Sequence, residues 1–203
     1  ADGTRVHRYL PLQIPAQARH YVRDSVQAGH SRQVDFEVSG DLRHMPFTTP
    51  EHGRFYIRAA IEDAVYDYAP QALLPHGQAP WPKLEQLSGA LVFEGAGMQV
   101  QGARARVAPV QGGAAQLPWQ TVDAEIADLS HPVVRVQGKT QAPLPTVLQV
   151  LRGSAIEQLT HGALAQAQAQ GLAALQLRLE LPIAALEHSQ VQGQLQLRSN
   201  QLQ

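Results

Sequence analysis

The chain of 203 residues contains no cysteine, and this absence excludes disulfides, cysteine-ligated zinc and a cysteine nucleophile. Aromatic residues make up only 5% of the chain, so its apolar surfaces must be built mainly from Leu, Val, Ile and Ala. The 16 Lys and Arg residues do not outnumber the 17 Asp and Glu residues, and without a basic excess nucleic acid is not an expected partner. No apolar run approaches about 18 residues, the length that marks a membrane-spanning helix.

Local signatures of catalysis and metal binding are also missing. No two of the nine histidines stand at i, i+2 or i, i+4, and no His-Glu-x-x-His is present. Ser154 does not fit the Gly-x-Ser-x-Gly pattern of a nucleophile elbow. Glu62, Asp63 and Asp67 alternate with apolar residues, so we interpret them as the polar face of a strand rather than as an acid–base pair. The sequence therefore predicts no enzymatic activity, no metal and no cofactor.

What the sequence does contain is a period of two. In SRQVDFEVSGDLRHMPF (31–47), Val34, Phe36 and Val38 fall on one side of an extended chain, and Asp35 and Glu37 fall on the other. The same alternation recurs at 54–63, 87–95, 97–102, 121–129, 133–139, 175–181 and 191–200. Half-buried antiparallel strands have this pattern, and the Gly and Pro residues at short spacing between them favour hairpins over βαβ crossovers.

Two segments have helical patterns instead. The spacing predicts a helix over 15–29, with Pro15 in its first turn and Gly29 at its end, and a second helix over 143–153. The segment GALAQAQAQG (162–171) is ambiguous, because Ala, Leu and Gln are good helix formers. Its alanines alternate with polar residues, and on that ground we favour a strand.

These elements predict a mainly β protein with a few short helices. One arrangement is a curved, largely antiparallel open sheet that forms a groove, whose inner face could receive lipid chains; the alternative is a β-sandwich or closed barrel filled by its own side chains. We expect a single β-rich segment over 1–203, excised from a longer chain. Its parts would be a helical N-terminal part (1–30), a first strand set (31–142), a helical insert (143–161) and a second strand set (162–203).

The order of these pieces resembles the central region of the YhdP family of AsmA-like proteins of Gram-negative bacteria, and the resemblance covers nearly the whole chain. The matching features are Leu10-Pro11-Leu12, a helix ending at Gly29, Gly40-Asp41-Leu42 followed by Pro46-Phe47, Trp81-Pro82 after a tyrosine-containing strand, and Leu181-Pro182 after alternating leucines.

The resemblance implies a periplasmic segment of a protein that is anchored in the inner membrane by one N-terminal helix. It further implies a taco-shaped β groove that carries phospholipid between the inner and outer membranes and supports outer-membrane integrity. The expected partners are phospholipid acyl chains and the rest of the parent chain, with envelope proteins as further candidates. A closed β scaffold or protein-interaction module of the envelope is the alternative function.

The residues expected to form the wall of such a groove are the apolar members of the alternating strands. They are Val34, Phe36, Val38, Phe55, Ile57, Leu91, Phe93, Leu175, Leu177, Leu179, Leu195 and Leu197. For each of them, packing against a helix or a facing strand is the other interpretation, because either predicted helix could cap or plug the groove.

Overall fold

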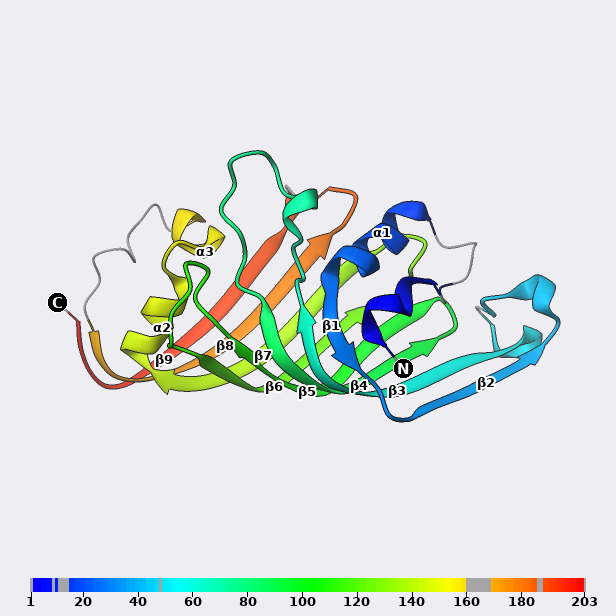
Figure 1. Cartoon of the computed structure of the whole chain (residues 1–203), viewed down its shortest axis with the longest axis horizontal. Coiled ribbons are helices and arrows are strands. Elements are labelled where there is room, and N and C mark those ends of the chain that lie inside the picture. Colours follow the sequence, from blue (N-terminus) through cyan, green and yellow to red (C-terminus); the bar gives the residue numbers. More distant parts are fainter. Residues whose placement is uncertain are drawn as a thin grey trace.

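One antiparallel sheet of nine strands organises the chain (Figure 1). The computed structural model describes residues 2–8, 10, 15–47, 49–159, 169–185 and 188–202. The strands are β1 (Val26–His30), β2 (Val34–Gly40), β3 (Gly53–Tyr66), β4 (Leu84–Glu94), β5 (Gly97–Val107), β6 (Leu117–Ile126), β7 (Val133–Pro143), β8 (Ala169–Pro182) and β9 (Gln190–Leu202). The helices are η1 (Gly3–Arg8), α1 (Ala16–Ser25), η2 (Leu42–His44), η3 (Pro50–His52), η4 (Gln71–Leu73), α2 (Leu144–Leu151) and α3 (Ala155–Leu159).

The sheet is open, as the first of the two predicted arrangements requires. Its order is β1-β3-β4-β5-β6-β7-β8-β9, and β2 pairs with β3 beyond the end of β1. Over the described part of the chain β9 pairs only with β8, and Figure 1 shows β2 and β9 at opposite ends of the sheet. The alternative of a β-sandwich or closed barrel is therefore wrong, because the described strands form one sheet whose two edge strands do not pair with each other.

Strand bulges in neighbouring positions accompany the curvature of the sheet. The pairing register shifts within β3, β4 and β5, next to three residues of positive φ: Asp63 (50°), Gln86 (50°) and Gly102 (56°). The extra residue of a bulge bends its strand and increases its twist. Side chains satisfy two of the displaced N–H groups, since Asp63 N donates to Ser88 Oγ (3.4 Å) and Gly102 N donates to Asp123 Oδ1 (2.7 Å).

Register places apolar residues in rows that cross the sheet. One row runs Phe36, Ile57, Phe93, Met98, Ile126, Val134, Leu181 from β2 to β8. The next runs Val34, Ala59, Leu91, Val100, Ala124, Val136, Leu179, Val191 from β2 to β9, and we call it the apolar lane. Because directly paired residues point to the same face, both rows lie on one side of the sheet.

On the concave side of the sheet, α2 and α3 lie toward its β8–β9 end, and η1 and α1 lie nearer β1 and β3 (Figure 1). The predicted helix over 143–153 is confirmed as α2, which packs against β6, β7 and β8. The predicted helix over 15–29 is wrong beyond Ser25, because the next five residues form β1 and pair with β3. Gly29 (φ 130°) allows this close approach, since a Cβ there would lie 2.7 Å from Cβ of Ala64.

The strand prediction for 162–171 falls mostly outside the described residues, which omit 160–168. The part that is described is extended, because β8 begins at Ala169.

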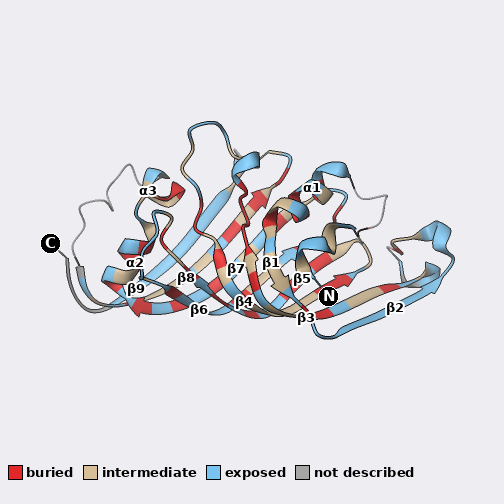
Figure 2. Ribbon diagram, in the orientation of Figure 1, coloured by how far each residue is buried: buried red, intermediate tan, exposed pale blue. Residues whose placement is uncertain are grey.

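Burial divides the sheet into a packed middle and two exposed edges (Figure 2). Every residue of β2 is exposed, and the described side chains of β9 are exposed as well. Six of the eight large apolar residues that remain exposed lie on these two edge strands, and the other two are Leu42 in η2 and Leu172 on β8; the six are Val34, Phe36, Val38, Val191, Leu195 and Leu197. The apolar surface that the fold leaves uncovered is thus concentrated at the two sides of the sheet.

A pair of strand glycines tests how tightly the concave face is packed. A Cβ on Gly138 would lie 2.5 Å from the ring of Trp119, which is itself buried, so Gly138→Ala should destabilise the protein by about 1–3 kcal/mol. Gly193→Ala is the matched control, because a Cβ added at Gly193 would lie 3.8 Å from the nearest atom. Urea unfolding should separate the two variants, and equal midpoints would show that the ring does not rest on Gly138.

Candidate functional site: an apolar cavity on the concave face

A cavity of about 490 Å³ lies between the sheet and the N-terminal helices. This volume falls in the range of about 300–1,000 Å³ that is usual for ligand pockets. Strands β3, β4 and β5 form its floor, and η1, α1 and β1 contribute to its roof and sides. The floor residues include Ile57, Ala59, Leu91, Phe93, Met98 and Val100, and the roof residues include Val6, Leu10, Tyr21 and Val22.

The structure gathers half of the predicted wall residues in this cavity. Those that line it are Val34, Phe36, Phe55, Ile57, Leu91 and Phe93. Val38 pairs with Phe55 on the same face, outside the cavity. The remaining five lie at the other end of the trough, on β8 (Leu175, Leu177, Leu179) and β9 (Leu195, Leu197). They share the concave face with the cavity but do not line it.

Several lining residues were not among the predicted wall residues. Met98, Val100 and Leu129 line the cavity from β5 and from the β6–β7 connection, and Val6 and Leu10 line it from the N-terminal segment. The alternation at 98–100 was a usable signal for the first two. Nothing in the local pattern indicates that the N-terminal segment folds back over a sheet whose strands begin later in the chain.

The apolar lane links the cavity to the far edge of the sheet. It crosses eight strands, and at about 4.8 Å per strand it is about 34 Å long. Val34 and Val191 at its two ends are 42% and 41% exposed, Leu91, Ala124 and Val136 are half-buried, and Ala59, Val100 and Leu179 are buried. A row of apolar side chains therefore runs from one edge of the sheet to the other, and solvent reaches it over part of its length.

The end of the trough beside α2 is filled by the protein itself. Residues 67–83, which connect β3 to β4 and which we call the strap, reach α3, where Ala155 N donates to Pro80 O (3.1 Å) and Ala79 N donates to Gln158 Oε1 (3.0 Å). The buried side chains at this end are Tyr68, Trp81, Leu84, Leu117, Trp119, Leu144, Val147, Leu148 and Val150. Among the described residues, the 490 Å³ cavity thus lies on the side of η1 and α1, away from this filled end.

Three buried tyrosines join the roof to the sheet and the strap. Tyr21 on α1 donates its O–H to the carbonyl of Tyr68 (3.0 Å), and its oxygen lies 2.9 Å from the hydroxyl of Tyr66 on β3. Because Tyr21 has one proton to donate, Tyr66 is the donor of the second bond. Burial raises the pKa of Tyr66 to about 12, and it raises the pKa values of Tyr21 and Tyr68 as well.

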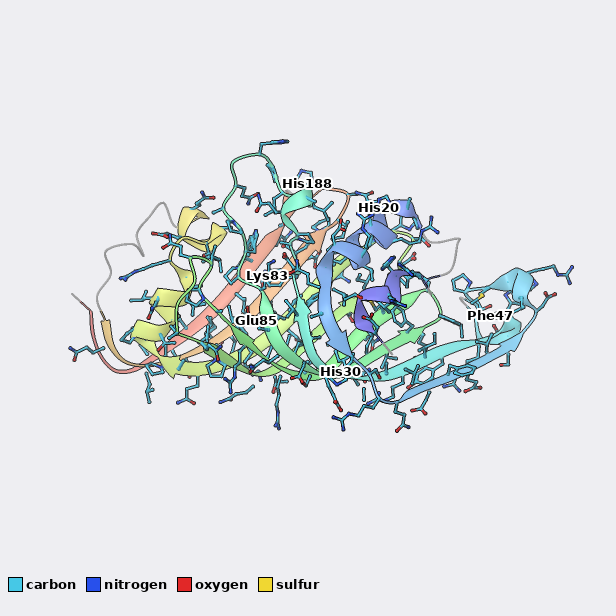
Figure 3. The ribbon with its side chains drawn as sticks, viewed as in Figure 1. His20, His30, Phe47, Lys83, Glu85 and His188 are labelled. Atoms are coloured by element: carbon cyan, nitrogen blue, oxygen red, sulfur yellow. The ribbon has the colours of Figure 1, made fainter. Side chains whose placement is uncertain are left out.

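The root of the strap is held by a buried carboxylate. Asp67 is only 6% exposed and lies 3.3 Å from Nζ of Lys83, which Figure 3 marks where the strap returns to the sheet. Gln27 Nε2 donates to the same carboxylate (3.2 Å) and Gln27 Oε1 accepts from Lys83 (2.9 Å). The interpretation of Asp67 as part of a solvated strand face is therefore wrong, because β3 ends at Tyr66 and the chain turns inward.

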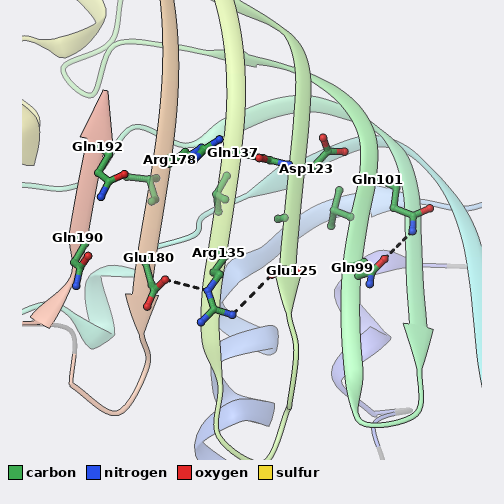
Figure 4. Close-up of a pocket in the computed structure, with 14 residues that line it drawn as sticks. Gln99, Gln101, Asp123, Glu125, Arg135, Gln137, Arg178, Glu180, Gln190 and Gln192 are labelled. Atoms are coloured by element: carbon green, nitrogen blue, oxygen red, sulfur yellow. Dashed lines mark hydrogen bonds and ion pairs between the residues drawn. The ribbon is translucent and has the colours of Figure 1, made fainter. Parts of the chain in front are cut away.

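The opposite face of the sheet is polar and holds a groove of about 660 Å³ (Figure 4). In it Arg135 pairs with Glu180 (3.0 Å) and reaches Glu125 (3.8 Å). Its labelled side chains are Gln99, Gln101, Asp123, Glu125, Arg135, Gln137, Arg178, Glu180, Gln190 and Gln192. Most of the side chains that line this groove are amide or charged groups, which favour water, so the concave face is the better place for an apolar ligand.

No metal centre is found in the parts of the chain that the structure describes, because no three His, Asp or Glu residues gather there. No helix among the described residues is long and apolar enough to cross a bilayer.

Comparisons with known proteins identify one family. A family model described as "YhdP protein" matches residues 1–203, the whole chain. Neither the comparison with curated proteins nor that with solved structures finds a match.

The tyrosine cluster predicts that the roof is sensitive to alkali. A folded-state pKa of about 12 for Tyr66, above the ordinary value of 10, means that the unfolded chain loses its phenolic proton first as the pH rises. The stability that burial of the neutral tyrosine provides is complete below pH 10 and decreases between pH 10 and 12. Tyr66→Phe should weaken this pH dependence of the free energy of unfolding and cost about 1 kcal/mol at pH 7.

Urea titrations of both proteins at several pH values would measure the effect. The surface variant Tyr56→Phe is the control, because the Tyr56 side chain stacks under Arg54 on the polar face. If the free energy of unfolding decreases equally for Tyr66→Phe and wild type above pH 10, ionisation of Tyr66 is not the cause of the lost stability.

Proposed function

Because the chain belongs to the YhdP family, we propose that it is a segment of a periplasmic conduit that carries phospholipid between the inner and outer membranes and so supports outer-membrane integrity. Family membership fits an envelope protein of lipid transport. One observation of this chain supports the proposal most strongly: the apolar lane runs unbroken across eight strands on a sheet that stays open. The acyl chains of a bound phospholipid would lie along the lane, and its head group would stay at the open side of the trough.

The free energy of moving an acyl chain explains why a surface of this kind is needed. Each methylene that leaves an apolar environment for water costs about 0.8 kcal/mol, so a lipid with roughly thirty chain carbons would cost on the order of 20 kcal/mol to expose fully. A wall of Leu, Val, Ile and Phe removes most of that cost. A bilayer gives the same shelter, so lipid in the groove and lipid in the membrane are nearly equal in free energy.

The dimensions of the lane suit passage better than storage. The hydrocarbon core of a bilayer is about 30 Å thick, so the chains of one leaflet extend about 15 Å. The lane of about 34 Å is roughly twice as long. Its shallow, partly exposed floor would hold a chain loosely, which favours movement from one strand to the next over tight capture.

Lipid that co-purifies with the chain gives a direct test. Phe36 lines the cavity and is 76% exposed, so Phe36→Glu should leave the fold intact while it places a charge on the acyl-chain path. We expect the amount of bound phospholipid, measured by native mass spectrometry after purification from bacteria, to fall about tenfold, as for about 1.4 kcal/mol of lost binding free energy.

The matched control for this variant is Leu42→Glu. Leu42 is 65% exposed and lies in η2, directly after the strand β2 that holds Phe36, and it does not line the cavity. It should keep the lipid content of the wild type. A wild-type chain that carries no phospholipid would refute the conduit, and equal loss in both variants would show that the site is not at Phe36.

Passage along the lane can be tested separately from binding. Ala124 is the small half-buried residue between the cavity and the β7–β9 side, so Ala124→Phe should narrow the lane while the cavity floor on β3 and β4 stays unchanged. With photo-reactive groups at Val34 and at Val191, the two ends of the lane, lipid cross-linking should persist at the first position and fall severalfold at the second. Ala60→Phe, on the exposed side of β3, is the control. Undiminished cross-linking at Val191 would argue against passage along the lane.

A protein-interaction module of the cell envelope is the second candidate function. The observation that favours it is the exposed apolar residues of β2 and β9, whose outer edges pair with nothing in the described part of the chain. Edge strands of this kind accept further strands. The lipid measurement above separates the two candidates, because an interaction module would purify without phospholipid.

A further inference from the structure

Among the described residues, charged side chains gather at one place on the rim of the cavity. Among the residues that line the cavity, Asp2, Arg5 and His30 are the ones that can be ionised apart from two tyrosines. Ile61 lines the cavity, so Glu62, the next residue of the strand, points to the opposite face of the sheet. The side chain of His30 lies 3.2 Å from Glu62 and is therefore directed toward that opposite face as well. Asp2 and Arg5 thus remain as the charged side chains at the mouth of an otherwise apolar cavity.

The fold holds this pair of residues on η1. Asp2 forms a β-bridge with His30, and Gly3 lies so close to Gly29 that a Cβ would be 3.0 Å from its carbonyl oxygen. One carboxylate oxygen of Asp2 accepts from N (3.0 Å) and Oγ1 (2.7 Å) of Thr4. The second oxygen lies 3.4 Å from Nε of Arg5. One positive and one negative group therefore stand side by side at the rim.

We propose that Arg5 and Asp2 bind the head group of the lipid and select a zwitterionic phospholipid, whose phosphate would contact Arg5 and whose ammonium group would contact Asp2. This inference rests on the proposed function and names the substrate class of the same site. The acyl chains would then enter between η1 and the floor strands, beside Val6.

The chemistry of the pair supports this choice. An exposed Arg–carboxylate pair contributes little in water, so a ligand that offers the same two charges replaces it at small cost. Arginine forms bidentate, charge-assisted hydrogen bonds to phosphate, and a carboxylate accepts hydrogen bonds from an ammonium group. The hydrogen bonds from Thr4 keep the pKa of Asp2 below its ordinary value, so the carboxylate is charged at neutral pH. An anionic lipid would satisfy Arg5 but place a like charge beside Asp2.

Competition between two lipids with the same acyl chains tests the inference. The 203-residue chain is incubated with vesicles of equimolar phosphatidylethanolamine and phosphatidylglycerol, separated from them, and its bound lipid is quantified by mass spectrometry. We expect phosphatidylethanolamine to exceed phosphatidylglycerol about fivefold, the ratio that one exposed ion pair can supply. Asp2→Asn should bring the ratio near one, and Arg5→Gln should reduce the bound amount of both lipids.

The chain offers a matched control on its other face. Arg135 and Glu180 form an exposed ion pair of the same kind (3.0 Å), so Arg135→Gln and Glu180→Gln should leave both the amount and the ratio unchanged. Bound lipid with a ratio of one in the wild type would overturn the head-group selection while the conduit stands. A chain that takes up neither lipid would overturn the conduit and the selection together. Circular dichroism of each variant verifies that the fold is retained.

Discussion

The structure depends on one constraint, which is that the period-two alternation of side chains stays in phase across every strand of the sheet. A slip of one residue would turn a strand's apolar side chains to the wrong face. The bulges make this demanding, because each extra residue reverses which positions face inward. On β3 the inward residues change from Ile57 and Ile61 to Ala64 and Tyr66, and on β5 they change from Val100 to Ala103. Since neighbouring strands shift near the same level, the apolar rows survive and the sheet gains its curvature.

Curvature alone does not produce a hollow, because a trough can be filled by the chain that forms it. The distribution of aromatic residues shows how the two ends differ. Both tryptophans, Trp81 and Trp119, are buried at the end beside α2, where the strap and the helix fill the space between them. The end beside α1 has small residues such as Ala59 and Ala64 in its floor and only a single helix with η1 above it. The cavity remains because its roof, held by Tyr21, stands off the sheet rather than packing into it.

The sequence predicted what depends on short-range pattern and missed what depends on contacts between distant segments. Alternation located the strands, and α2 followed from its apolar face between Pro145 and Gly153. The strand β1 was missed because its five residues carry no alternation, and only pairing with β3 makes them extended. The burial of Asp67 was missed for the same reason, since its partners Lys83 and Gln27 are distant in sequence. The predicted wall residues share the concave face, but only half of them line the cavity, because the roof covers only one end.

The two ends of the apolar lane bear on how lipid could move along it. Val34 and Val191 are exposed to nearly the same extent, 42% and 41%, and each lies on a strand whose outer edge is unpaired in the described part of the chain. Val34 also lines the cavity, so an acyl chain would be better sheltered at that end than at Val191. The asymmetry of the molecule thus lies in a cavity with a charged rim at one end and a filled trough at the other. Net transport along such a lane would follow a difference in lipid supply between the two edges, because a passive apolar surface lowers the barrier equally in both directions.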